Sequence, residues 1–292
     1  MAAVERCGKP RDIRVSIQVS FFHERARMNR HAYSLAIGTA ASARSRHDAA
    51  AAALLELDAM LGAGGVLDKV IGAGGGFEVG THYPPGEVHD PRTEAQYYYH
   101  AHVDIPTDAP AKPPSRGPDH GHFHVFLGAG GMPLGVAPLV LPEMALAPPL
   151  AGPSSLARLA TERARRERGP VSHLIAITLD AAGQPIALFT TNRWVTGETW
   201  YRAPDVVRML DAFAFTAELS EEPVNRWLSA LLVFYRNEIE QLIHARDEAV
   251  MDWRRRRRGR VHVFDDRRLE VTSSLPIDLR RDLGRWAARA AR

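Results

Sequence analysis

The chain has 292 residues, 45% of them hydrophobic, which allows one large domain or two small ones with a substantial core. Its 37 basic and 34 acidic residues leave a formal net charge of +3, too mild for bulk charge alone to indicate a nucleic-acid partner. The single cysteine, Cys7, excludes a disulfide framework and any thiolate-rich zinc or iron–sulfur site. A bound metal would therefore need nitrogen and oxygen ligands.

Residues 1–45 carry many arginines and small side chains but few acids, and we expect them to form a peripheral N-terminal extension. A transit-like peptide or a start at Met28 would also fit this composition. The segment lacks the apolar region and cleavage site of a secretory signal. No apolar run approaches the roughly 18 residues needed to cross a bilayer. We therefore expect a cytoplasmic protein with no membrane partner.

Alanine and leucine predict a helix over 47–61, which the glycines at 62–65 terminate. Three strands are then expected, at 77–82, 96–105 and 120–127, because apolar and polar residues alternate with a period of two. A proline-rich connection separates the second strand from the third. Residues 128–170 form a long insert rich in proline and glycine, with a short helix at 155–166.

Strands at 171–180 and 185–194, joined by a turn at 181–184, make the strongest predicted hairpin. Helices are expected at 205–215 and 221–253, followed by a short strand at 261–264 and a helix at 276–291. Because strands and helices are segregated, the sequence predicts an α+β fold with an antiparallel sheet and flanking helices. We expect one domain over 46–253, and an arginine-rich segment with a C-terminal helix over 254–292.

Seven of the 13 histidines lie between His82 and His124. A period of two places His100 and His102 on one face of their strand, with His120, His122 and His124 on one face of the next. If the two strands pair as a hairpin, these imidazoles lie on the same side of the sheet. Opposed residues on neighbouring strands have Cβ atoms about 4.5–5.5 Å apart, so several rings could reach one ion.

The leading hypothesis is therefore a divalent metal centre of Fe, Cu, Mn or Zn. Its ligands are expected to be His100, His102, His122 and His124. Three residues are reserve ligands or hydrogen-bond partners of a ligand: His120, Asp104 and Glu87. A redox or oxygen-activating enzyme fits such a ligand set best, and a hydrolytic zinc enzyme is the nearest variant.

The paired H-x-H elements are comparable with those of double-stranded β-helix metal enzymes, although the glycine spacing of that family is absent and the strands are too few. The competing interpretation is a non-catalytic ligand-binding or regulatory module, whose histidines form a hydrogen-bonded, pH-sensitive polar face.

The string TTNRWVTGE places polar residues at the end of the strongest strand. Asn192, Arg193 and Trp194 are candidate ligand-binding residues, with Arg193 suited to a carboxylate or phosphate of a small molecule. A strand end followed by a turn is the alternative. His173 alternates with apolar residues and is expected to be a buried, hydrogen-bonded histidine. Glu240 and His244 are expected to be an exposed pair on one helix face.

The run from Arg254 to Arg258 could neutralise several phosphates of a nucleic acid. It lacks interleaved aromatic residues, and it falls where the C-terminus of a helix attracts cations. We therefore expect nucleic acid to be an unlikely partner, while the sequence leaves the oligomeric state open.

Three strings, QYYYHAH, DHGHFHVF and LFTTNRWVTGE, together resemble a family of bacterial proteins of uncharacterised function. The resemblance covers roughly His47 to Arg246 and implies that these residues belong to one domain. It implies no activity.

Overall fold

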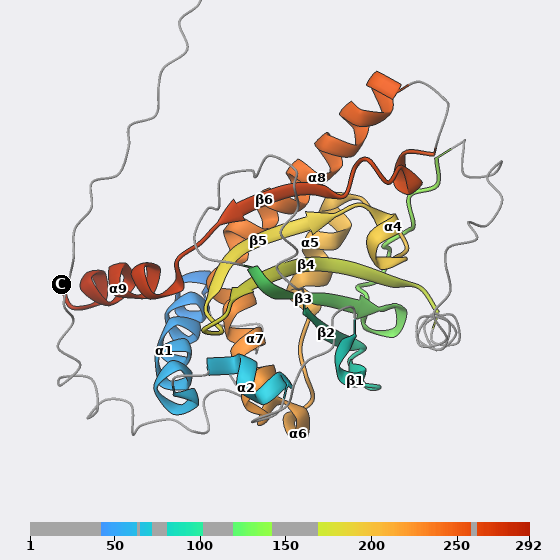
Figure 1. The fold of residues 1–292 in the computed structure, drawn as a ribbon. Helices are drawn as coiled ribbons and strands as arrows, with labels where there is room; N and C mark the ends of the chain where they lie inside the picture. Colours follow the sequence, from blue (N-terminus) through green and yellow to red (C-terminus); the bar gives the residue numbers. More distant parts are fainter. Residues whose placement is uncertain (1–41, 63–64, 72–80, 102–118, 142–168, 258–261) are drawn as a thin grey trace, which may run out of the picture.

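The computed structural model describes residues 42–62, 65–71, 81–101, 119–141, 169–257 and 262–292. Its centre is a six-stranded antiparallel sheet in which every strand pairs with its neighbours in chain order (Figure 1). The strands are β1 His82–His89, β2 Ala95–Ala101, β3 Asp119–Gly128, β4 Val171–Asp180, β5 Pro185–Thr191 and β6 Val271–Pro276. The expected α+β class with an antiparallel sheet is confirmed.

Helices cover one face of this sheet, with α5, α7 and α8 lying behind it in Figure 1. The described α-helices are α1 Ala43–Leu61, α2 Gly65–Ile71, α4 Arg193–Thr196, α5 Ala203–Ala212, α6 Ala217–Ser220, α7 Pro223–Phe234, α8 Arg236–Arg257 and α9 Leu279–Ala290. In this part of the chain no single helix has the length and apolar composition to cross a membrane; only the bent pair of α1 and α2, taken together, meets that test.

The main core lies between the sheet and the helices, because alternate strand residues point to that side. These helix-facing residues are Tyr97, Tyr99, Phe123, Val125, Ile175, Ile177 and Leu188. Phe123 meets Trp227 of α7 with ring centroids 5.8 Å apart. Residues after 253 share the same core, since Leu279 and Leu283 of α9 belong to it.

The expected long helix over 221–253 is two helices, a correction to the sequence prediction. Tyr235 separates them with φ −97° and ψ 22°, and α8 begins at Arg236. The Tyr235 hydroxyl donates a hydrogen bond to Asp282 of α9 over 3.0 Å, and its ring packs edge-on against Phe234. The apolar period is continuous across this break, so the pattern read along the sequence does not predict it.

The hairpin of β4 and β5 is confirmed, but β5 ends at Thr191 because Asn192 caps the short helix α4. The strand expected at 261–264 is wrong: Val263–Asp265 form a 3₁₀ helix, and β6 instead follows at Val271–Pro276 and pairs with β5. Only two of the six β6 residues are aliphatic, so pairing at the sheet edge decides this strand more than its own pattern. The strand expected at 77–82 and the helix at 155–166 lie mostly or wholly outside the described residues.

A histidine row as the candidate functional site

Histidines from three strands line up across the sheet. His82 of β1 pairs with His100 of β2, and His100 pairs with His122 of β3. Two residues further along these strands, and on the same face, Tyr98 pairs with His124. Because directly opposed residues project to the same side, these side chains share the face opposite the helix-facing core. The sequence prediction that the two H-x-H strands pair side by side is thus confirmed for His100, His122 and His124.

We call His82, His100, His122, His124 and His173 the histidine row. Successive rings meet in order: centroids are 5.8 Å apart for His82 and His100, and 5.6 Å for His100 and His122. The separations are 4.6 Å for His122 and His124, and 5.1 Å for His124 and His173. The five imidazoles therefore form one continuous series of ring contacts across β1, β2, β3 and β4.

Burial increases along the row. His82, His100 and His122 are half-buried, whereas His124 and His173 are each only 2% exposed. The two buried rings are joined by a hydrogen bond between Nδ1 of His124 and Nε2 of His173, 3.1 Å apart. One nitrogen must carry the proton and the other must accept it. The row is thus accessible at its His82 end and enclosed at its His173 end. The prediction that His173 is a buried, hydrogen-bonded histidine is confirmed.

Aromatic rings border the row. Tyr98 stacks on His82 at 3.8 Å and lies 5.1 Å from His124. Phe189 of β5 meets the edge of His122 at 5.1 Å, and Phe126 lies 5.1 Å from His173. These apolar walls lower the local polarity around the imidazoles, so electrostatic interactions between the rings and any bound ion are stronger than in water.

A carboxylate stands at each end of the row. Glu87 lies 3.2 Å from Nδ1 of His82, and its side chain is 2% exposed. At the buried end, Glu198 accepts a 2.8 Å hydrogen bond from the backbone N–H of His173. Burial raises the pKa of Glu198 to about 7, although the positive charge of Arg246 opposes the shift. The second oxygen of Glu198 is buried and makes no hydrogen bond within the described residues.

His120 departs from the expected face. The pairing register of β3 with β4 shifts between Asp119 and Gly121, and Nδ1 of His120 lies 2.7 Å from the hydroxyl of Tyr99. Tyr99 belongs to the helix-facing core, whereas His122 does not. A Cβ on Gly121 would lie within 3.0 Å of backbone atoms of β2, so only glycine allows this close approach. The expectation that His120 shares a face with His122 and His124 is therefore wrong, because the irregularity at Gly121 interrupts the period of two.

Two of the predicted metal residues, His102 and Asp104, lie outside the described residues. Among those that are described, no group of three or more His, Cys, Asp or Glu side chains is arranged to hold a metal ion. Glu87 contacts the row at His82. The structure thus brings together three predicted ligands and leaves their role as ligands a prediction.

The predicted ligand-binding trio is held by contacts within the chain. Asn192 caps α4 and donates to the carbonyl of Val263 over 2.8 Å. Arg193 pairs with Asp265 at 2.5 Å, and the Trp194 indole donates to a backbone carbonyl over 2.8 Å. A ligand at these residues would have to displace one of these contacts, and their ligand-binding role stays a prediction.

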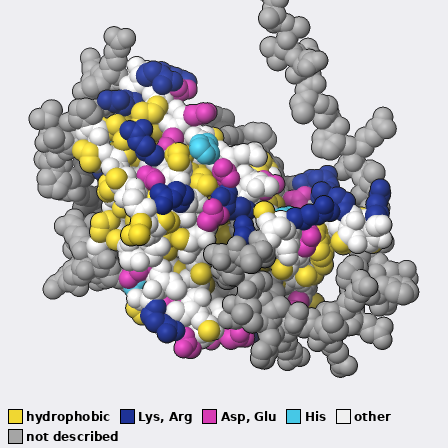
Figure 2. Space-filling view, turned by 180° about the vertical axis from the view of Figure 1, so that it is seen from behind, with side chains coloured by type: hydrophobic (Ala, Val, Ile, Leu, Met, Phe, Trp, Pro, Cys, Tyr) yellow, Lys and Arg dark blue, Asp and Glu magenta, His cyan; other side chains and the backbone are white. Residues whose placement is uncertain are grey.

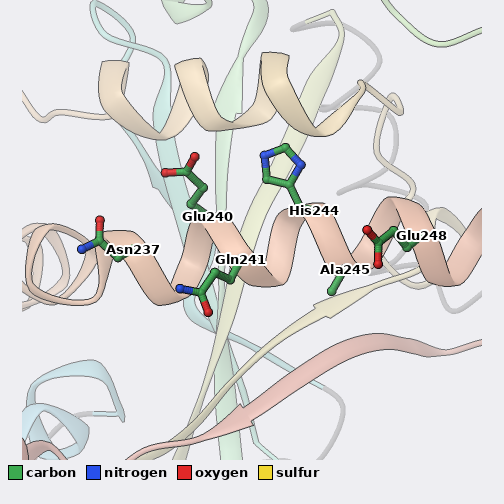
Figure 3. Close-up of a pocket in the computed structure, with 6 residues that line it drawn as sticks. All are labelled: Asn237, Glu240, Gln241, His244, Ala245 and Glu248. Atoms are coloured by element: carbon green, nitrogen blue, oxygen red, sulfur yellow. The ribbon is translucent and has the colours of Figure 1, made fainter. Parts of the chain in front are cut away.

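A groove of about 540 Å³ runs along α8, and all its lining residues come from that helix: Asn237, Glu240, Gln241, His244, Ala245 and Glu248 (Figure 3). Glu240 and His244 project to the same side of the helix in this view. His244 is exposed, and Glu240 is paired with Arg236 at 2.7 Å. The pair is an exposed one, as expected, and a groove with one helix as its lining is a weak candidate for a binding site.

Sequence reasoning did not place His82, His173 or Glu198 in this site. His82 lies in a loop-like string with two prolines, and His173 sits in a strand 49 residues from its partner His124. The two histidines share a position on a strand, but that signal becomes specific only once the pairing register is known. Glu198 follows α4 and lies outside the strands, so strand alternation could not have found it.

Fold and site together define an α+β protein with a six-stranded antiparallel meander, one face covered by helices and the other carrying the histidine row. The chain belongs to the family described as a domain of unknown function (DUF6969), whose profile matches residues 48–277. Comparisons with curated proteins and with solved structures gave no match.

Proposed function

We propose that the histidine row binds one divalent transition-metal ion, with His100, His122 and His124 as its central ligands and His102 as a further ligand. The observation that supports the proposal most is the contact of these three rings at centroid separations of 5.6 and 4.6 Å. Two imidazoles bound to one ion through nitrogens at about 2.0–2.1 Å have centroids roughly 5 Å apart. The separations of the His100–His122 and His122–His124 pairs, which lie on either side of this value, support the proposal.

Binding requires the rings to turn rather than the backbone to move. His100 and His122 meet nearly edge to face, with 75° between their planes, and His122 and His124 meet at 83°. Rotation about the side-chain torsions aims their nitrogens at a common point while the strand pairing is kept. Neutral imidazoles with few carboxylates nearby suit Fe, Cu or Zn better than Mg or Ca.

The half-buried end of the row supports a role in small-molecule chemistry. His82, His100 and His122 are partly accessible, so a bound ion near them could keep an open coordination position for a substrate. Fe or Cu would supply redox chemistry, and Zn would supply an activated water for hydrolysis. The identity of the bound metal therefore selects between the two enzyme classes.

A second function has its own supporting observation. The hydrogen bond between His124 and His173 joins two buried imidazoles that cannot both be charged at low cost. A metal-free protein would use this pair as part of a pH-sensitive polar face that regulates ligand binding or assembly.

Metal content separates these functions. The full chain is purified without a histidine tag and its metals are measured by elemental analysis, together with His122→Ala and the matched control His244→Ala. His244 is an exposed histidine on α8, outside the row. We expect close to one ion per chain in the wild type and in His244→Ala, and a loss of at least tenfold in His122→Ala, with folding checked by circular dichroism.

Equal and substoichiometric metal in all three proteins would refute the metal site. A change in oligomeric state or ligand affinity between about pH 5 and 8 in that metal-free protein would then support the regulatory function.

A further inference from the structure

We propose that the C-terminal end of α8, with the segment that packs beside it, is a nucleic-acid-binding surface separate from the histidine row. We call this surface the basic end. Its described arginines are Arg254, Arg255, Arg256 and Arg257 of the last helical turn, with Arg267 and Arg268 of the following segment. Figure 1 shows this end of α8 projecting past the sheet, and Figure 2 shows Lys and Arg side chains gathered at the matching corner of the molecule.

The geometry of the helix spreads these charges around the projecting end. Four consecutive residues of an α-helix point about 100° apart, so their side chains surround the helix instead of sharing one face. The side chains of Arg255 and Arg256 are 71% and 73% exposed. They can therefore reach a partner that lies against the end of α8 from outside.

The described residues 252–268 carry more positive than negative charge, six arginines against three aspartates. A helix C-terminus carries a partial charge of only about −0.5, which one cation satisfies. Asp252 pairs with both Arg255 and Arg256, and Asp266 pairs with Arg268. Asp265 already forms an ion pair with Arg193. The described acids of residues 252–268 are thus shared among more arginines than they can neutralise, so the surface keeps a local excess of positive charge.

Tertiary packing also adds the aromatic rings that the linear sequence lacks beside these arginines. Arg257 lies over the ring of Trp253 at 4.7 Å, and Arg267 lies over Trp194 at 5.9 Å. Both indoles are anchored, because Trp253 donates to Asp266 and Trp194 donates to the carbonyl of Leu269. Rigid, half-buried rings next to guanidinium groups offer flat surfaces on which bases stack, while the arginines bind phosphates.

This combination favours nucleic acid over other anionic partners. An anionic membrane or an acidic protein would use the charges but has no need of flat aromatic and guanidinium surfaces. Single-stranded nucleic acid uses both, because its bases are free to stack and its backbone carries one charge per nucleotide.

The test is binding of the full-length chain to fluorescently labelled 20-nucleotide single-stranded RNA and DNA, and to a 20-base-pair duplex, by fluorescence anisotropy at 50–200 mM salt. Four phosphate contacts predict that the Kd rises about 50-fold for the single strands over this range, and about 150-fold for the duplex. The variant R254Q/R255Q/R256Q/R257Q is expected to lose most of this salt dependence and to bind at least tenfold more weakly at 50 mM salt.

The matched control is R280Q/R281Q/R285Q/R289Q. It removes four exposed arginines from α9 and changes the net charge equally. We expect it to bind as the wild type does, within about twofold. Equal loss in both variants would show that binding depends on bulk charge only and would overturn the proposal.

Two outcomes overturn the proposal without any variant, so it does not depend on how well the substituted helix folds. One is wild-type protein that binds none of the three oligonucleotides at 50 mM salt. The other is tighter binding of the wild type to vesicles of anionic phosphatidylglycerol than to single-stranded RNA or DNA, when each Kd is expressed as a concentration of negative charges.

Discussion

Replacing Glu198 with glutamine should change how the stability of the protein depends on pH. Glu198 is 3% exposed, and burial raises the pKa of its carboxyl from 4.5 to about 7 in the folded protein. Glutamine has the same shape as the protonated carboxyl. It keeps an oxygen that can accept from the backbone N–H of His173. The substitution therefore removes the titration and preserves the main contact.

The sign and size of the effect follow from proton linkage. Between pH 4.5 and 7 the folded protein holds a proton on Glu198 that the unfolded chain has released, so stability falls as the pH rises through this range. Below pH 4.5 both states are protonated, and above pH 7 both are ionised. The shift from 4.5 to about 7 corresponds to about 3 kcal/mol. Relative to the wild type, Glu198→Gln should thus gain about 3 kcal/mol between pH 4.5 and 8.

Urea unfolding of both proteins at half-unit steps from pH 4.5 to 8 measures this difference. Other titrating groups are common to the two proteins, so they largely cancel when the two free energies of unfolding are subtracted. Parallel curves, with a difference that stays constant within about 0.5 kcal/mol, would show that the folded protein does not hold Glu198 protonated and would refute the reasoning.

Two further predictions test the framework of the site. Gly121→Ala should destabilise the protein by about 1–3 kcal/mol, because its Cβ would lie within 3.0 Å of β2 backbone atoms. The control Gly130→Ala, whose Cβ would meet a flexible side chain at 3.1 Å, should cost much less. Equal unfolding free energies for the two variants would contradict this reasoning. Asp90 is buried, yet hydrogen bonds from the backbone N–H groups of Thr216 and Arg92 outweigh its burial and lower its pKa to about 2. The stability that the ionised Asp90 contributes is therefore present above about pH 4 and is lost as the pH falls through 2. Asp90→Asn should cost about 2 kcal/mol of unfolding free energy at pH 7 and progressively less below pH 4. A cost that does not depend on pH would exclude this role.

The alternation of residues was enough to predict that three histidines of β2 and β3 share a face. His100, His122 and His124 follow a period of two over short, regular strands, and the pairing of neighbouring strands in a hairpin is the commonest arrangement. The same local signal located the β4–β5 hairpin and the α+β class. Such features depend on residues near one another in the chain, which is why a pattern read along the sequence predicts them.

The period failed where the backbone is irregular. The register shifts at Gly121, and His120 lies against Tyr99. At Tyr235 the backbone leaves the helical conformation although the apolar stripe is continuous. At Gly121 the reason is the close approach of the β2 backbone, which the alternation of side chains does not reveal.

Only the tertiary structure decided the extent of the histidine row and of the basic end. The register of β1 with β2 and of β3 with β4 brought His82 and His173 against histidines that the sequence had already grouped. Packing of α4 and the 262–270 segment brought Trp194 beside Arg267. The sequence by itself determined the type of side chain and, where a strand is regular, its face. The neighbours of each side chain depend on strand register and helix packing over tens of residues, and these are set by burial of the whole core.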